Sequence, residues 1–211
     1  MKNKLAEDCH NCDLRPTCKQ VVWGSGNSGL WEAEDHWDMP RIMLIAEAPG
    51  KQEDKLGVPL VGRTGEETDW LLARYGLKRS NIYCTNVVKC RPVDNKDPKP
   101  HQIEACIPWL EQELGTIKPE LVIAMGRFST RYFLPAANME MANGVPYQVR
   151  GFTLVPVYHV AAGLHNPSTM MGINAGFKTV KDVLAGARVP RHVQDPYEGR
   201  EEYFELGDGD L

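Results

Sequence analysis

The sequence predicts an α/β protein, a three-layer α/β/α sandwich built on a central, mostly parallel sheet of four strands. Two observations lead to this prediction. Four short and almost continuously apolar runs are typical of strands that are buried on both faces. Segments with helical periodicity separate these runs, and strands that alternate with helices form parallel sheets covered on both sides.

The first strand and the helix that follows it have clear end signals. We expect the strand at residues 41–46, where the run RIMLIA stops at the turn sequence EAPG. We expect the helix at residues 64–75, because Thr64 suits the position before a helix and Glu66 and Glu67 suit its first turn. These two elements form the first strand–helix unit of the fold.

The rest of the chain repeats this alternation of strand and helix. Apolar continuity defines the strands, and apolar residues three or four positions apart define the helices. In chain order we expect a strand at 81–88, a helix at 100–114, a strand at 120–125, a helix at 127–134, a strand at 152–158 and a helix at 173–185.

One domain accounts for almost the whole chain. The 211 residues are 42% hydrophobic and 25% charged, which is an ordinary globular composition. We expect a domain at residues 1–190 and a flexible tail at 191–211, which is acidic and rich in Gly and Asp. No apolar run approaches the roughly 18 residues of a membrane span, and we expect no signal peptide. We therefore expect a cytoplasmic protein, a monomer, that does not contact membranes.

The charge is unevenly distributed along the chain. The net charge is −4, from 24 basic and 28 acidic residues, but residues 41–190 carry 18 basic and 14 acidic side chains. The excess of acid lies in the first 40 residues and in the tail. A mildly basic body permits a site for a polyanion without proving one, and an ordinary solvated surface explains the same numbers.

The cysteines suggest a metal centre, because six cysteines in a cytoplasmic chain do not indicate disulfides. The spacing of Cys9 and Cys12 lets two thiolates reach one metal centre from a single turn. Cys84 lies inside a strand-like run and is expected to be a buried, inert thiol. A site formed by Cys9, Cys12, Cys90 and Cys106 is possible if the N-terminus folds back, and zinc or an iron–sulfur cluster would both accept it.

Polar residues follow the predicted strands at the end where catalytic groups gather in such sheets. Glu47 follows the first strand, Asn86 ends the second, Gly126 follows the third and His159 follows the fourth. Because the carboxyl ends of parallel strands meet at one edge, a carboxylate, an amide and an imidazole are expected to converge there. Such a set can read a polar base edge while it stabilises a leaving group.

Three segments resemble the motifs of the family 4 uracil-DNA glycosylases. Residues 46–54 with 57–63 (AEAPGKQED and GVPLVGR) resemble the first motif, and residues 85–92 (TNVVKCRP) resemble the middle motif. Residues 158–162 (YHVAA), followed by Asn166-Pro167, resemble the third. The resemblance covers residues 9–185 with the motifs in the family's order, which is far more specific than one short pattern.

The resemblance implies an enzyme that flips uracil out of DNA, hydrolyses its N-glycosidic bond and leaves an abasic site. It implies a structural [4Fe–4S] cluster, and Cys9, Cys12, Cys90 and Cys106 fall at the positions of the family's ligands. The cluster would tie the N-terminus to residues 90–106. It would also bring Lys89, Arg91 or Lys96 near DNA phosphates.

The resemblance also implies roles for the residues at the strand ends. His159 donates to a uracil oxygen as charge builds on the departing base, and Asn86 reads the amide edge of uracil. Glu47 or Glu53 orients the water or supports the sugar cation, and this choice stays open. The remaining positions implied to bind substrate are Ala48, Gly50, Leu60 and Asn95, and those implied to contact DNA are Gly163, Leu164 and His165.

Several positions depart from the family pattern. Leu60 stands where the family has a phenylalanine that stacks on uracil, and Val160 stands where the family has a proline. These departures keep two alternatives open: a catalytically weak iron–sulfur protein that binds DNA, or a glycosylase for another deaminated base. For single residues, His159 could be a satisfied structural histidine, and Glu53 could lie on a solvated face.

Overall fold

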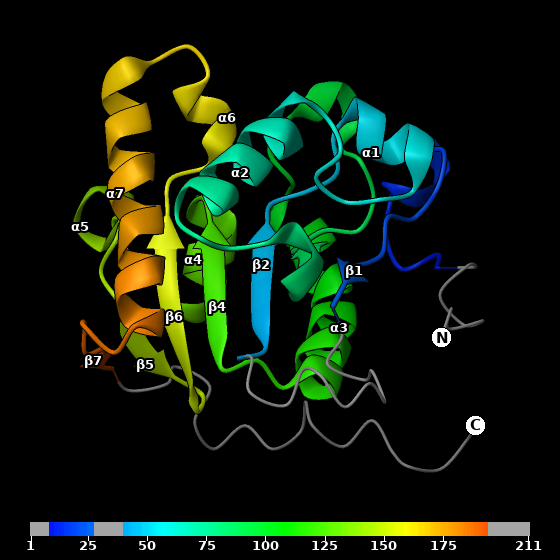
Figure 1. Cartoon of the computed structure of the whole chain (residues 1–211). Helices are drawn as coiled ribbons and strands as arrows, with labels where there is room; N and C mark the ends of the chain where they lie inside the picture. The colour runs from blue at the N-terminus through cyan, green and yellow to red at the C-terminus, as the bar shows by residue number, and fades with distance from the viewer. Residues whose placement is uncertain (1–8, 28–39, 194–211) are drawn as a thin grey trace.

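The computed structural model describes residues 9–27 and 40–193 and forms a three-layer α/β/α sandwich (Figure 1). The parallel centre of the sheet has the order β3-β2-β4-β6. These strands are β2 (Ile42–Ala46), β3 (Ile82–Asn86), β4 (Leu121–Met125) and β6 (Phe152–Val157). The predicted fold class and all four predicted strands are confirmed, each to within two residues at its ends.

The predicted strand count is wrong, because the described residues form a seven-stranded sheet. β1 (Ser25–Gly26) pairs antiparallel with β3, and β5 (Tyr147–Val149) pairs antiparallel with β6. β7 (Arg191–His192) pairs parallel with β5, so folded structure continues past residue 190. These strands have two or three residues each, which is too short for an apolar run to mark them in the sequence.

Seven α-helices lie in the described residues. They are α1 (Lys51–Leu56), α2 (Arg63–Arg74), α3 (Pro100–Ile117), α4 (Arg127–Phe133), α5 (Met139–Ala142), α6 (Val160–Gly163) and α7 (Pro167–Leu184). Helix α7 begins six residues before its predicted start, because the Asn166 side chain accepts the N–H groups of Ser168 and Thr169 and so caps the helix there.

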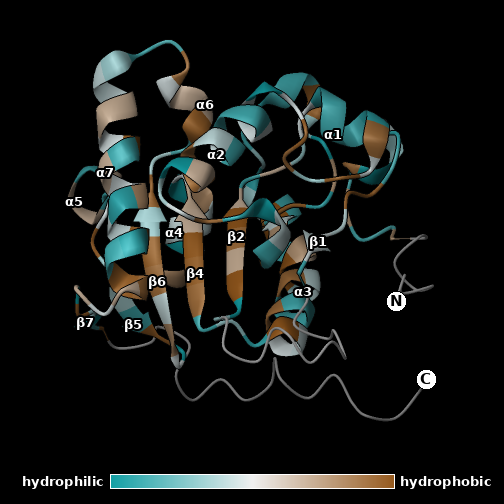
Figure 2. Ribbon diagram, in the orientation of Figure 1, coloured by the Kyte–Doolittle hydropathy of each residue, from teal (hydrophilic) through white to brown (hydrophobic). Residues whose placement is uncertain are grey.

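Two apolar clusters hold the layers together, and they separate along β2 by the alternation of a strand. Met43 and Ile45 pack with α3 and α4 on one face, whereas Ile42, Leu44 and Ala46 pack with α2, α6 and α7 on the other. The central strands are accordingly the most hydrophobic part of the ribbon (Figure 2).

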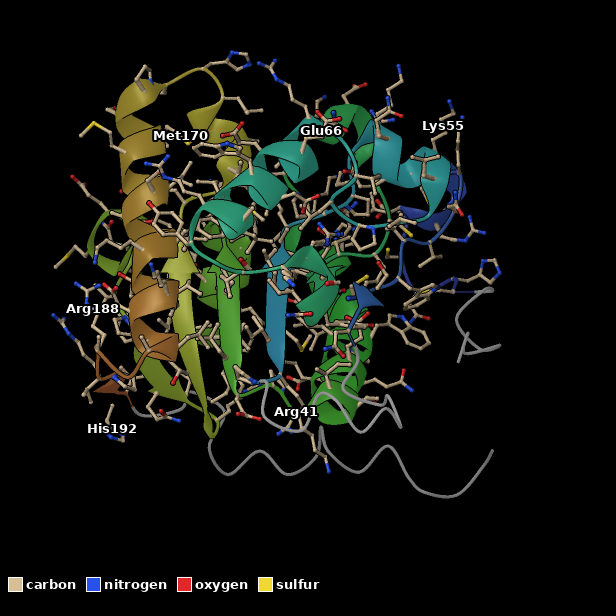
Figure 3. All side chains as sticks on the ribbon, in the orientation of Figure 1. Arg41, Lys55, Glu66, Met170, Arg188 and His192 are labelled. Carbon is tan, nitrogen blue, oxygen red and sulfur yellow. The ribbon has the colours of Figure 1, made fainter. Side chains whose placement is uncertain are left out.

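Polar side chains gather at the ends of the strands. Figure 3 shows Lys55 and Glu66 beyond the carboxyl ends of the strands and Arg41 at the opposite end. None of the helices in the described part of the chain is both long enough and apolar enough to cross a membrane.

Candidate functional site

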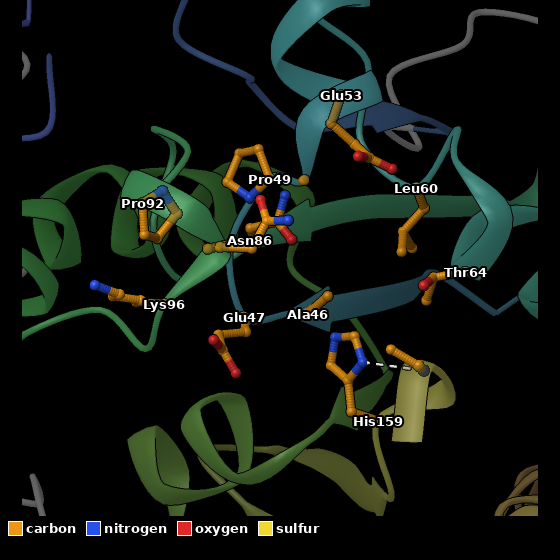
Figure 4. Close-up of a pocket in the computed structure, with 14 residues that line it drawn as sticks. Ala46, Glu47, Pro49, Glu53, Leu60, Thr64, Asn86, Pro92, Lys96 and His159 are labelled. Atoms are coloured by element: carbon orange, nitrogen blue, oxygen red, sulfur yellow. Dashed lines mark hydrogen bonds between the residues drawn. The ribbon is translucent and has the colours of Figure 1, made fainter. Parts of the chain in front are cut away.

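A cavity of about 320 Å³ opens at the carboxyl ends of the central strands. This volume lies at the lower end of the range for small-molecule sites, roughly 300–1,000 Å³. The structure brings eight of the predicted residues together in its walls, namely Glu47, Ala48, Gly50, Glu53, Leu60, Asn86, Asn95 and His159. Figure 4 shows Glu47, Asn86 and His159 facing the same space from three different strands.

Glu47 and Asn86 are neighbours because β2 and β3 pair in parallel up to their ends, where Ala46 lies opposite Asn86. The pairing continues beyond the strands, since the N–H of Val88 donates to the carbonyl of Glu47 (3.0 Å). The Asn86 side chain is buried, and its Nδ2 has no hydrogen-bond partner among the described residues. A buried amide donor without a partner is costly, so this atom is suited to meet a ligand acceptor in the cavity.

The carboxylate of Glu47 lies in an environment that favours its protonated form. Burial, together with the nearby charge of Asp97, raises the pKa of Glu47 to about 7, although Arg127 opposes the shift. No hydrogen bond to the Glu47 side chain is found within residues 9–27 and 40–193. A carboxyl group that changes charge near neutral pH at a cavity wall is suited to accept a proton.

Glu53 has a different local role. Its Oε1 accepts the backbone N–H groups of Val61 (3.0 Å) and Gly62 (2.9 Å), so the carboxylate holds the loop before α2. Only 8% of Glu53 is exposed, and the alternative of a solvated face is therefore wrong. Of the two candidate carboxylates, Glu47 is the one whose oxygens are not already used by the backbone.

His159 lies between the end of β6 and the start of α6. Its Nδ1 accepts the backbone N–H of Ala161 (3.3 Å), the hydrogen bond drawn in Figure 4. Burial lowers the pKa of His159, which favours the neutral imidazole. Because Nδ1 is an acceptor, the single proton of the neutral ring lies on Nε2, which can donate into the cavity and has no partner in the described part of the chain.

The wall formed by Leu60 has an unusual backbone. Leu60 has φ of +54° and is almost fully buried. The Arg79 guanidinium donates to the carbonyls of Pro59 (2.8 Å) and Leu60 (3.3 Å), which supports this turn. A Cβ atom on Gly65 would lie 2.0 Å from the Leu60 carbonyl oxygen, so only glycine permits this close approach of α2.

The remaining predicted residues lie around this cavity. The Oδ1 of Asn95 accepts the Nε–H of Arg91 (2.7 Å). Gly163 is buried, Leu164 is half-buried, His165 is exposed, and none of the three lines the cavity. The expectation that Lys89 lies near DNA phosphates is wrong, because only 1% of its surface is exposed and it pairs with Glu113.

Five cysteines share one apolar cluster beside α3. Cys90 and Cys106 are buried, and the half-buried Cys9, Cys12 and Cys18 pack against the same cluster. The backbone N–H of Lys89 donates to the Sγ of Cys106 (3.4 Å). In the described part of the chain, no three ligating side chains converge as they would around a single metal ion. Cys84 is buried elsewhere, in the second apolar cluster, as predicted.

The comparison with known proteins decides the family. The model of the Uracil DNA glycosylase superfamily matches residues 36–184, more than half of the chain. The chain belongs to the uracil DNA glycosylase superfamily. The Type-4 uracil-DNA glycosylase of Archaeoglobus fulgidus is 32% identical to it over 191 residues, which are 86% of this chain and 90% of that protein.

Two further relatives of this superfamily member differ in length. The Type-4 uracil-DNA glycosylase of Saccharolobus solfataricus is 36% identical over 84% of this chain and 82% of its own. A DNA polymerase of Bacillus phage SP01 is 25% identical over 80% of this chain but only 20% of its own length. The chain is therefore comparable in length to the two glycosylases and to a minor part of the polymerase.

Six further residues line the cavity of the superfamily member and were not predicted to bind substrate, namely Ala46, Pro49, Thr64, Pro92, Lys96 and Ala161. Thr64 was assigned only to a helix start, and Ala161 lies inside the third motif, two residues after His159. Pro92 is the last residue of the middle motif, so its place in that motif was the available signal. Lys96 brings a positive charge to the cavity, which suits a polyanionic ligand.

Proposed function

We propose that the protein is a monofunctional uracil-DNA glycosylase of base excision repair, which hydrolyses the N-glycosidic bond of uracil in DNA and leaves an abasic site. The similarity to two proteins that are named Type-4 uracil-DNA glycosylases supports this activity. The observation that carries it is a pair of donors, Asn86 Nδ2 and His159 Nε2, that have no hydrogen-bond partner among the described residues and line one cavity beside Glu47.

The reaction needs a stabilised leaving group. A water oxygen forms a bond to C1′ of the deoxyribose as the bond from C1′ to uracil N1 breaks, and the bonding electron pair remains on uracil. The negative charge spreads to the uracil oxygens, where a donor from His159 Nε2 is most effective in a site without bulk water. Asn86 can both donate and accept, so it can recognise the amide edge of uracil.

Glu47 is the carboxylate that we assign to the water. As the new bond to C1′ forms, the water loses a proton, which an ionised Glu47 can accept and pass on to solvent. We assign to Glu53 the support of the loop at residues 60–62. The main chain at Ala48 and Gly50, with Leu60 and Asn95, would enclose the base, and the loop Gly163-Leu164-His165 would contact the DNA.

We propose that Cys9, Cys12, Cys90 and Cys106 hold a [4Fe–4S] cluster. The donor set fits, since these four thiols lie in one apolar cluster, which they share with Cys18, and such a group requires four thiolates. The N–H of Lys89 already points at the Sγ of Cys106, as is typical of outer-shell donors to a thiolate. The cluster would supply a structural cross-link between the N-terminal segment and α3. A cytoplasmic location and a monomeric state stay predictions from the sequence.

A second candidate is a relative that binds DNA with weak excision. The match to part of a phage DNA polymerase favours a role beside replication, and Leu60 removes an aromatic surface from the site. The two candidates differ in what the protein releases. The test incubates it with oligonucleotides that contain uracil, hypoxanthine or thymine, and measures the free base by chromatography. We expect release of uracil alone; release of hypoxanthine in preference, or DNA binding without release, would contradict the proposal.

A further inference from the structure

Lys89 is the most deeply buried charged side chain among the described residues. All three of its ammonium hydrogens have acceptors, which are Oγ1 of Thr85 (2.7 Å), the carbonyl oxygen of Asn86 (2.7 Å) and Oε2 of Glu113 (2.6 Å). Lys89 has no role in the proposed excision of uracil. A lysine at this depth therefore needs another explanation, because burial of a charge is costly unless its partners are fixed.

Glu113 anchors this lysine to three parts of the fold. Besides Lys89, its carboxylate accepts the hydroxyl of Thr85 (2.7 Å), the phenol of Tyr83 (3.3 Å) and the N–H of Gly24 (3.0 Å). Burial raises the pKa of Tyr83, which keeps the phenol a donor. The network thus joins α3, β3 and the segment before β1 and leaves Lys89 little freedom to move.

The main chain of Lys89 connects to the cysteine cluster. Its N–H donates to Cys106, its carbonyl accepts the N–H of Val22 (2.8 Å), and Cys90 is the next residue. Lys89 therefore contacts the cysteines through its backbone and the end of β3 through its side chain.

The Asn86 amide depends on its backbone for its direction. Within residues 9–27 and 40–193, no hydrogen-bond partner orients its Nδ2. On one side, the backbone from Asn86 onward is held by β2, since the N–H of Val87 donates to the carbonyl of Ala46 (2.9 Å). On the other side, the Asn86 carbonyl is held by the ammonium group of Lys89.

We infer that Lys89, fixed by Glu113, is a positioning residue for base recognition: it holds the Asn86 main chain so that the Asn86 amide meets the edge of the base. This inference rests on the proposed function. An apolar pair of the same size would commonly be as stable as a buried ion pair, so stability alone does not explain its presence. The hydrogen bond to the Asn86 carbonyl explains why the ion pair is present, because small errors in the position of a recognition group strongly reduce rates.

The test uses paired substitutions that leave no buried charge alone. Lys89→Met with Glu113→Gln removes both charges of the network. Arg150→Met with Glu111→Gln is the matched control. Arg150, in the turn between β5 and β6, forms another largely buried ion pair (2.8 Å) with Glu111, which lies on α3 as Glu113 does. Within the described residues, neither side chain is hydrogen-bonded to Asn86 or to a cysteine. Each pair is made in the wild-type chain and in Asn86→Ala. Iron content and melting temperature are measured for every protein.

We expect the Lys89 pair to slow single-turnover release of uracil by about tenfold or more, the scale of a misplaced recognition group. In the Asn86→Ala background the same pair should change the rate less than about twofold, because its effect passes through Asn86. The control pair should leave the rate unchanged in both backgrounds. An equal loss in both backgrounds, an unchanged rate in the wild-type background, or loss of iron from the Lys89 pair alone would overturn the inference.

A second readout separates this inference from the proposed function. The side-chain amide signals of Asn86 in ¹⁵N–¹H spectra should shift in the Lys89 pair and not in the control. If the wild-type protein releases no uracil, the proposed function fails, and the spectra still decide the positioning claim. Unshifted Asn86 signals in the Lys89 pair would overturn it.

Discussion

Gly126 leaves the space that the His159 side chain occupies. A Cβ atom on Gly126 would lie 3.1 Å from both Cβ and Cδ2 of His159, and Gly126 has φ of +91°, which disfavours any other residue. β4 and β6 are adjacent strands, so the His159 side chain lies against the end of the neighbouring strand. A side chain at position 126 would therefore displace the imidazole of His159, the residue that we propose as the donor to the departing base.

We predict that Gly126→Ala slows uracil release and destabilises the fold by about 1 kcal/mol or more, because of the strained φ and the displaced imidazole. Single-turnover rates and urea unfolding measure the two effects. Gly115→Ala is the matched control, since no atom lies within 4 Å of a Cβ at that helical position. It should keep the rate. Equal rates in both variants would show that His159 does not depend on Gly126.

Glu47 should make stability depend on pH. Its pKa is raised from 4.5 to about 7 in the folded state, so the folded chain binds the extra proton between these pH values. Stability contributed by the protonated form is present below about pH 4.5 and is lost as pH rises to about 7. Glu47→Gln should therefore raise the melting temperature most above pH 7 and least near pH 4.5. A pH-independent difference between the two proteins would contradict the burial of this carboxyl.

Leu60 is predicted to limit the affinity for the base. Leu60→Phe would restore an aromatic surface, and stacking on a base contributes roughly 1–3 kcal/mol. The wild-type residue already has positive φ, so the substitution adds no new backbone strain. Binding of a uracil-containing strand should tighten by about fivefold or more. Unchanged binding and unchanged excision would favour the weak DNA-binding relative.

The cysteine assignment predicts iron content. Cys90→Ser should lose most of the bound iron and sulfide, because one of four thiolate ligands is missing. Cys84→Ser is the matched control, since Cys84 is equally buried but lies in the other apolar cluster. Iron and acid-labile sulfide are measured on protein purified without oxygen. Full iron content in Cys90→Ser would remove this residue from the ligand set.

Much of the fold follows from apolar patterning, and the misses have local causes. The four central strands are continuous apolar runs, a pattern that is typical of strands buried on both faces of a sheet. Helix α1 was missed because Glu53 and Asp54 look solvated in the sequence. Their burial depends on backbone N–H groups far along the chain, such as that of Lys19, which donates to Asp54 Oδ1 (2.8 Å).

Some features of the site could likewise be predicted from the sequence, and others could not. The convergence of Glu47, Asn86 and His159 follows from parallel strand order, because each residue stands at a strand end. The burial of Lys89 could not be predicted, since its partner Glu113 is 24 residues away on another element. The packing of different elements determines which side chains pair, so such a pair cannot be predicted from the residues next to either partner.

His159 is the residue that we propose as the donor to the departing base. The most direct test is single-turnover excision from a uracil-containing single-stranded oligonucleotide, with abasic sites revealed by alkali, for the wild-type protein and His159→Ala. Loss of one such donor typically costs about 100-fold to 1,000-fold in rate. We predict abasic sites with the wild-type protein and a loss of that size in the variant. Equal rates for the two proteins, or no abasic sites with the wild-type protein, would contradict it.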